Sequence, residues 1–167
     1  MDILTDASTI SAHDQLVLVV QVLAACLAGG IVGLERELAG KRAGIRTHMV
    51  VAVAAALAVG IGRIVAAGSG AGDPTRVFHG LLTGIGFIGA GAIITNVRPG
   101  TTGLTTAATI LLVAVLGAVS AFGAPFLALG GAVFALMLLR GLVVVERPLR
   151  FLTSKFHGDE DEAPDGV

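Results

Sequence analysis

Apolar residues dominate the chain in five long runs, which short polar or Gly/Pro-rich stretches separate. A transmembrane helix needs about 20 largely apolar residues. Five segments have this length: 15–34, 47–68, 75–95, 104–122 and 124–145. The pattern predicts an all-α polytopic membrane protein whose domain, residues 15–146, is a compact bundle of five transmembrane helices.

Local signals support these boundaries. Asp73 followed by Pro74 is typical of a capping residue and the first helical position, and it predicts the start of the third helix. The threonine pair 101–102 can cap the fourth helix. Gly123 and Pro125 predict a tight turn, which makes the last two helices an antiparallel hairpin.

Composition agrees with this pattern. Only 14% of the residues are charged, against about 25% in a typical soluble domain. Glycine accounts for 24 of the 167 residues, roughly twice its usual share. No basic patch with interleaved aromatic residues is present, so the sequence does not favour nucleic-acid binding. The one cysteine, Cys26, excludes an intrachain disulfide and a cysteine metal cluster.

Orientation follows from Lys and Arg, which favour the cytoplasmic side of a membrane. If the N-terminus lies outside, only Arg63 and Arg76 of the 11 basic residues face the outside. We therefore expect an N-out/C-in orientation. Residues 1–14 are then an extracytoplasmic tail, and 147–167 are a cytoplasmic acidic tail.

A first polar cluster joins the end of the first helix to the start of the second. It can be an interfacial charge belt with snorkelling side chains. Alternatively, Gly29 and Gly33 let a neighbouring helix approach closely, and the carboxylates at that contact form a fixed ion-pair network in which Arg46 pairs with Glu35. The candidate functional residues on this cytoplasmic side are Glu35, Arg36, Glu37, Lys41, Arg46, Thr47 and His48.

A second cluster, Asp73 and Arg76, lies on the outer side, near Arg63. Asp73 can be only a helix cap, and Arg63 can snorkel to the interface. The functional alternative is a salt-bridged gate or cation entry point, because ionisable residues within a membrane are candidates for function. His79 has no second ligand at helical spacing, so we expect no metal site.

Threonines repeat at spacings of three and four at the start of the fourth helix, at Thr102, Thr105, Thr106 and Thr109. This spacing places them on one helical face. They can act as interhelical packing contacts or as the polar lining of an ion path.

Residues 84–89 have the G-x-G-x-x-G spacing of a dinucleotide-binding fingerprint. That fingerprint needs a preceding strand and an acid about 20 residues later, whereas here it lies inside an apolar run. We instead expect a glycine-rich, central third helix, in which Gly84→Leu or Gly91→Leu breaks the bundle. The expected packing glycines are Gly29, Gly33, Gly80, Gly84, Gly86, Gly89, Gly91 and Gly103.

Four motifs in order resemble the MgtC/SapB family of bacterial inner-membrane proteins. They are residues 33–49 (GLERE, then KRAGIRTHM), residues 73–76 (DPTR), residues 84–91 (GIGFIGAG) and residues 103–108 (GLTTAA). The chain is similar to the short SapB-type form, without the ACT-like C-terminal domain of many members. The resemblance implies a bacterial inner-membrane location, a role in magnesium limitation and virulence, and, for some members, inhibition of ATP synthase.

Two functions remain open. The first is a non-enzymatic regulatory protein that binds other membrane proteins, among them ATP synthase, or itself. The second is a small cation (Mg²⁺) transporter or channel. No set of nucleophile, base and orienting residue is evident, so we expect no enzymatic activity, no cofactor and no metal centre.

Overall fold

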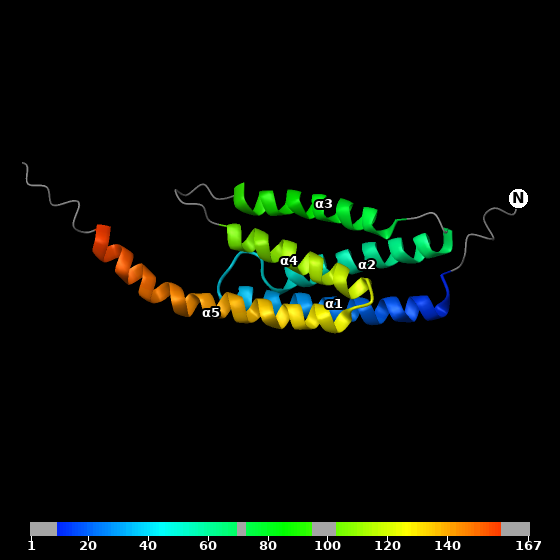
Figure 1. The fold of residues 1–167 in the computed structure, drawn as a ribbon, viewed down its shortest axis with the longest axis horizontal. Coiled ribbons are helices and arrows are strands. Elements are labelled where there is room, and N and C mark those ends of the chain that lie inside the picture. Colours follow the sequence, from blue (N-terminus) through cyan, green and yellow to red (C-terminus); the bar gives the residue numbers. More distant parts are fainter. Residues whose placement is uncertain (1–9, 70–72, 95–102, 158–167) are drawn as a thin grey trace, which may run out of the picture. The chain divides into compact units, whose positions relative to one another are not determined.

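The computed structural model describes residues 10–69, 73–94 and 103–157, and these form five α-helices in chain order (Figure 1). Four of them are long and apolar enough to cross a membrane, and Pro125–Gly141 is a shorter apolar stretch. The described residues contain no strand. The helices are α1 Ala12–Leu38, α2 Ile45–Ser69, α3 Pro74–Ile94, α4 Leu104–Ala121 and α5 Pro125–His157.

Two helices end in the same way, because each is followed by a glycine in the left-handed region. Gly40 (φ 66°) follows α1, and Gly123 (φ 98°) follows α4. Backbone bonds from Lys41 N to Arg36 O (2.9 Å) and from Gly40 N to Glu37 O (3.0 Å) form a Schellman motif. The corresponding pair closes α4, so both sharp reversals have a local cause.

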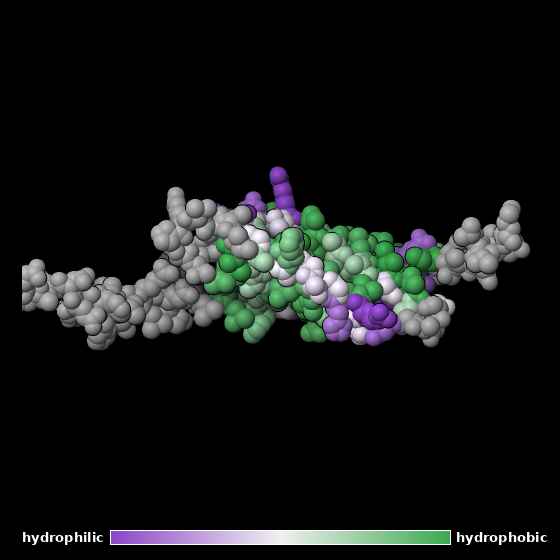
Figure 2. Space-filling model, turned by 90° about the horizontal axis from the view of Figure 1, so that it is seen from above, coloured by the Kyte–Doolittle hydropathy of each residue, from purple (hydrophilic) through white to green (hydrophobic). Residues whose placement is uncertain are grey.

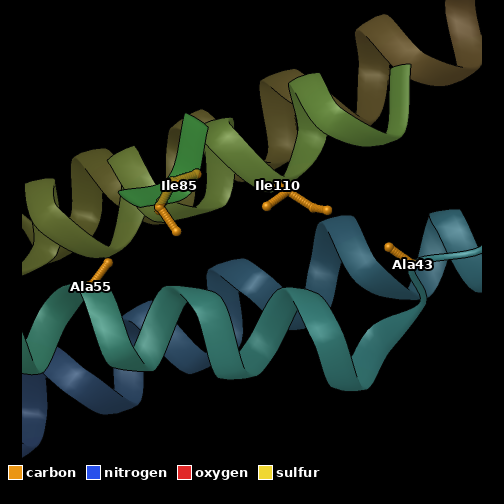
Figure 3. Close-up of a cluster of buried hydrophobic side chains, with 5 residues drawn as sticks. Ala43, Ala55, Ile85 and Ile110 are labelled. Atoms are coloured by element: carbon orange, nitrogen blue, oxygen red, sulfur yellow. The ribbon is translucent and has the colours of Figure 1, made fainter. Parts of the chain in front are cut away.

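The chain divides into two compact units after Val133. In the first unit, α1, α2 and α4 pack against one another, and α3 packs along α4 and α2. Figure 3 shows the cluster in which Ala55 of α2, Ile85 of α3 and Ile110 of α4 meet. The second unit begins within α5, at Phe134. This helix extends to His157, so it is longer than the helix expected at 124–145.

Close helix contacts in the first unit depend on missing side chains. A Cβ at Gly29 would lie 2.6 Å from His48 O, and a Cβ at Gly33 would lie 2.7 Å from the Cα of Ile45. A Cβ at Gly117 of α4 would overlap the carbonyl oxygen of Ala52. Small residues thus allow α1 and α4 to approach the backbone of α2.

The third helix is not the centre of the bundle, contrary to the expectation from its glycines. Only 11% of its apolar window is buried, against 56% in α4. A Cβ added at Gly80, Gly84, Gly86 or Gly91 would meet no atom within 4 Å. The helix packs through Leu81, Ile85 and Ala92 instead, so apolar side chains decide which face of α3 is buried.

Two further glycines differ from each other. A Cβ at Gly89 would meet only the Cβ of Ala107, at 3.6 Å, which is ordinary contact. Gly103 is the N-cap of α4 in the left-handed conformation (φ 103°), so it serves a turn rather than a helix contact. The expected caps at 101–102 lie outside the described residues.

The surface of the described helices is largely apolar. Figure 2 shows a face with broad hydrophobic areas and polar residues gathered in small groups. Large apolar side chains are exposed on several helices, among them Leu27 (61%), Phe87 (82%) and Phe126 (86%). An apolar surface of this kind is what a bilayer accommodates.

Candidate functional site

Polar side chains of α1, α2 and α4 gather where α1 ends and α2 begins. We call this group the junction cluster: Glu35, Arg36, Glu37, His48, Thr106 and Thr109. The Gly40 reversal returns the chain so that the end of α1 lies beside the start of α2. Five of its members are buried, namely Glu35, Arg36, His48, Thr106 and Thr109.

His48 is the centre of the junction cluster and has no exposed surface. Its Nδ1 lies 2.8 Å from Gly44 O, and its Nε2 lies 3.0 Å from the hydroxyl oxygen of Thr109. A carbonyl oxygen only accepts, so Nδ1 carries a proton. In the neutral ring Nε2 then accepts the proton of Thr109, and one side chain links the start of α2 to α4.

Thr109 has a second acceptor within reach, because its hydroxyl oxygen lies 2.9 Å from Thr106 O. A hydroxyl has one proton and can donate to only one of the two acceptors. Protonation of His48 would make Nε2 a donor and would turn the Thr109 proton toward Thr106. The contact therefore has two self-consistent hydrogen-bonding states.

Glu35 and Arg36 form a buried ion pair with 3.6 Å between Oε2 and Nη1. This differs from the expected pairing of Glu35 with Arg46, whose side chain is exposed. Glu35 Oε2 and the Nε and Nη2 atoms of Arg36 are buried, and they have no hydrogen-bond partner among the described residues. Unmet hydrogen bonds of this kind are costly, and they favour a bound water or polar ligand at the pair.

Glu37 supports the start of α2 from outside that helix. Its Oε2 accepts a hydrogen bond from Ile45 N at 2.9 Å. A Cβ at Gly44 would lie 2.6 Å from the same oxygen, so the absence of a side chain there makes room for the carboxylate. A carboxylate is favourable at this position because the first N–H groups of a helix have no partner within it.

The other residues expected in this cluster lie at its edge. Lys41, Arg46 and Thr47 are exposed. Among the threonines, Thr106 and Thr109 are buried, Thr105 is exposed, and Thr102 lies outside the described residues. The threonine face thus has two parts, a buried contact with His48 and an exposed position.

The second expected cluster does not form an ion pair among the described residues. Asp73 caps α3, as its sequence predicts: its Oδ1 accepts from Thr75 N at 2.9 Å and from the Thr75 hydroxyl at 2.6 Å. These two hydrogen bonds lower the pKa of Asp73 below its ordinary value. Arg76 is exposed. His79 bonds back to Thr75 O, at 2.8 Å.

A buried polar contact at the other end of α1 was not expected from the sequence. The hydroxyl of Ser120 donates to Gln21 O at 2.7 Å, and the Gln21 side chain lies 3.4 Å from Nη2 of Arg63. Gln21 and Ser120 each lie inside an apolar run. A single polar residue in such a run indicates a hydrogen-bonding partner, because an unpaired polar group is costly there. Their pairing across ninety-nine residues could not be seen in a linear sequence.

The described residues contain no group of three or more His, Cys, Asp or Glu side chains placed to hold a metal ion. The junction cluster places the Thr109 hydroxyl beside the imidazole of His48, and both side chains are buried. Its geometry fixes three helices together, and it leaves hydrogen-bonding capacity on Glu35 and Arg36.

Most of this chain is similar to known proteins. Residues 22–148 match the model of the MgtC family. YhiD of Escherichia coli K12, whose name provisionally calls it a magnesium transporter, is 33% identical over 144 residues, which cover 83% of this chain and 66% of YhiD. SrpB of Synechococcus elongatus is 39% identical over 145 residues, or 80% of this chain and 79% of SrpB.

The protein MgtC of Brucella abortus is 44% identical over 108 residues, or 60% of this chain and 42% of that protein. The chain thus matches less than two thirds of the length of YhiD and of this MgtC. No solved structure matches the chain. The matched segment contains residues 22–38 of α1 and the whole of the other three apolar helices that are long enough to span a membrane. The chain therefore belongs to the MgtC family and is a multi-pass membrane protein.

Proposed function

We propose that this protein is a non-enzymatic regulator in the bacterial inner membrane, that it serves adaptation to magnesium limitation, and that it acts by associating laterally with another membrane protein. The name of YhiD and the family match support the link to magnesium. ATP synthase is the first candidate partner, on the strength of the family resemblance. A second copy of the chain is the alternative partner.

The exposed face of α3 carries this proposal. Gly80 and Gly84 lie one turn apart on it, and a Cβ at either position would meet no atom within 4 Å. Phe87 and Ile88, which are 82% and 47% exposed, continue the same face. Helices in membranes associate closely through small residues of this spacing.

Glycine is unfavourable on a helix face that contacts only lipid, because it destabilises the helix. Each glycine weakens a helix by about 1 kcal/mol relative to alanine in water. Gly29, Gly33 and Gly117 offset that cost with close contacts inside the chain. Gly80 and Gly84 have no such contact within 4 Å. Close packing of a neighbouring helix against their backbone would therefore offset the helix stability that these glycines lose.

The test compares two glycines that are both open in the structure. Gly84→Leu and the control Gly130→Leu on α5 add the same side chain where a Cβ meets no atom within 4 Å. Chemical crosslinking in native membranes, followed by quantitative mass spectrometry, measures the partner. We expect wild type and Gly130→Leu to recover the same partner and Gly84→Leu to lose it by tenfold or more.

Two outcomes contradict this proposal. One is equal recovery by Gly84→Leu and Gly130→Leu. The other is the repeated absence of any specific partner, ATP synthase and a second copy included, for the wild-type chain. Circular dichroism of the purified variants is the control, because it shows whether a loss of partner reflects weaker association or unfolding.

Cation transport is the second candidate, and the buried junction cluster favours it because ionisable residues inside a membrane protein often mark ion sites. The bundle interior between this cluster and the Gln21–Ser120 contact does not favour an ion path. Val32 of α1, Val59 of α2 and Val113 of α4 lie along these helices between the two polar groups, and each is fully buried. In sealed liposomes we expect no protein-dependent Mg²⁺ flux; a flux that Glu35→Gln abolishes would replace the regulatory proposal with transport.

A further inference from the structure

A cavity of about 700 Å³ lies between the first turns of α1 and the last turns of α2, at the opposite end of these helices from the junction cluster. We call it the outer cleft. Val17, Ile64 and Ala67 form apolar parts of its wall, and Asp14 and Arg63 are its charged residues. With the N-out orientation, it opens at the outer surface of the membrane.

Arg63 lies inside the apolar segment Ile45–Gly68, five residues before its end, or about 7.5 Å along a helix. It forms no ion pair with any described residue. Among the described residues, its hydrogen bond is with Gln21 alone and is long, 3.4 Å from Nη2 to the side-chain oxygen. A partly buried guanidinium with five donors and so little compensation favours an anion in the space beside it.

Asp14 supplies the opposite charge in the same cavity. Its side chain is 49% exposed, and its Oδ1 lies 3.9 Å from Nδ1 of His13, which is 83% exposed. The outer cleft therefore combines a cation within the apolar segment, a carboxylate in the first turn of α1, and apolar walls. A ligand that matches all three has an anionic group, a cationic group and hydrocarbon chains.

We propose that the outer cleft binds one phospholipid whose headgroup carries a phosphate and a primary ammonium. The phosphate accepts paired hydrogen bonds from the Arg63 guanidinium, whose planar geometry suits oxyanions. The ammonium lies toward Asp14 and donates to its carboxylate. The acyl chains lie along Val17, Ile64 and Ala67 and continue into the bilayer. The site does not depend on the partner proposed for α3.

The absence of tryptophan and tyrosine from the chain gives a clean test. Ala67→Trp places one fluorophore in the outer cleft, and Leu16→Trp places one on an exposed, apolar part of α1 that does not line the cavity. In phosphatidylcholine bilayers, we replace part of the lipid by phosphatidylethanolamine with brominated chains. We expect the fluorescence of the Ala67→Trp variant to be quenched more than the mole fraction of brominated lipid predicts, and that of the Leu16→Trp variant to follow the mole fraction.

Arg63→Gln is the decisive variant, and Arg76→Gln is its control, because Arg76 is an exposed arginine at the start of α3 outside the cavity. In the Ala67→Trp background, we expect Arg63→Gln to lower the relative affinity for the brominated lipid about tenfold, as for the loss of one charge-assisted contact. We expect Arg76→Gln to leave it unchanged. Equal quenching in both variants overturns the proposal.

Two further experiments test the chemical identity of the ligand. Brominated phosphatidylglycerol, which lacks the ammonium, should bind the wild-type cleft less well, and Asp14→Asn should remove that preference. Equal binding of both lipids to the wild type overturns the assigned headgroup. Displacement by water-soluble glycerophosphoethanolamine would assign the cleft to free phosphate esters and overturn a lipid site.

The tryptophan of Ala67→Trp could itself fill the outer cleft, so lipid binding is also measured by native mass spectrometry of the chain without this substitution. Retention of one phosphatidylethanolamine by the wild type and Arg76→Gln, but not by Arg63→Gln, supports the proposal. Equal retention by all three proteins contradicts it.

Discussion

At the scale of single residues, the missing Cβ atoms of a few glycines decide how closely the helices approach. Gly29 and Gly30 are neighbours on α1, and the sequence predicts a packing role for Gly29. In the structure, a Cβ at Gly29 would lie 2.6 Å from a backbone oxygen of α2, whereas a Cβ at Gly30 would lie 3.7 Å from the flexible side chain of Met49. One position therefore excludes any side chain and the other accepts alanine.

Gly29→Ala should lower the free energy of unfolding by about 1–3 kcal/mol, because the overpacked α1–α2 contact must separate. Gly30→Ala should be neutral or slightly stabilising, since alanine is the better helix former. Unfolding by sodium dodecyl sulfate in mixed micelles, followed by circular dichroism, measures both. Equal effects of the two substitutions would show that α1 and α2 are not in the close contact described.

The hydrogen bond between His48 and Thr109 is the other decisive contact at this scale. Thr109→Val keeps the shape of the side chain but leaves Nε2 of a fully buried imidazole without its partner. We expect a loss of about 1–3 kcal/mol in the free energy of unfolding. Thr105→Val on the exposed side of α4 should change it by less than about 0.5 kcal/mol. A neutral Thr109→Val would exclude His48 as a link between α2 and α4.

At the scale of helices, their ends could be predicted more fully than their packing. Asp73 and Pro74 predicted the start of α3, and Gly123 predicted the reversal after α4, because capping depends on a few consecutive residues. The burial of α3 could not be predicted in the same way. Its glycines suggested a central helix, but the competition among apolar faces leaves α3 at the edge of the first unit.

The cap of α3 should respond to acid. The hydrogen bonds from Thr75 lower the pKa of Asp73 below 3.8, so the carboxylate contributes to capping above that pH. Its contribution is lost as the pH falls through the lowered value. We expect a carbon-13 NMR titration of the Asp73 carboxyl to have its midpoint below 3.8, and Thr75→Ala to raise that midpoint. A midpoint that Thr75→Ala leaves unchanged would exclude the hydroxyl as a cause.

At the scale of the whole molecule, charge distribution predicts which end of the helices faces the cytoplasm. Lys41 follows α1 at the junction end, whereas Arg76 lies near the start of α3. Both side chains are exposed, so each position suits a chemical label. The rule that basic loops remain in the cytoplasm places Lys41 inside and Arg76 outside.

The single cysteine makes this orientation testable. After Cys26→Ala, the variants Lys41→Cys and Arg76→Cys each carry one thiol. A membrane-impermeant maleimide added to intact spheroplasts should label Arg76→Cys and spare Lys41→Cys until the membrane is opened. The reverse labelling pattern would show that the chain is inserted with its N-terminus inside.

The sequence by itself determined the membrane class, the five helices and the family resemblance, because long apolar runs, caps and ordered motifs are local properties of the chain. The tertiary structure decided which partners meet. It pairs Glu35 with Arg36, links His48 to Thr109 and leaves Gly84 open, since these outcomes depend on how helices distant in the sequence pack. An apolar run favours burial in a bilayer whichever neighbour it has, whereas a buried polar atom or an absent Cβ acquires its role only from the atom opposite it.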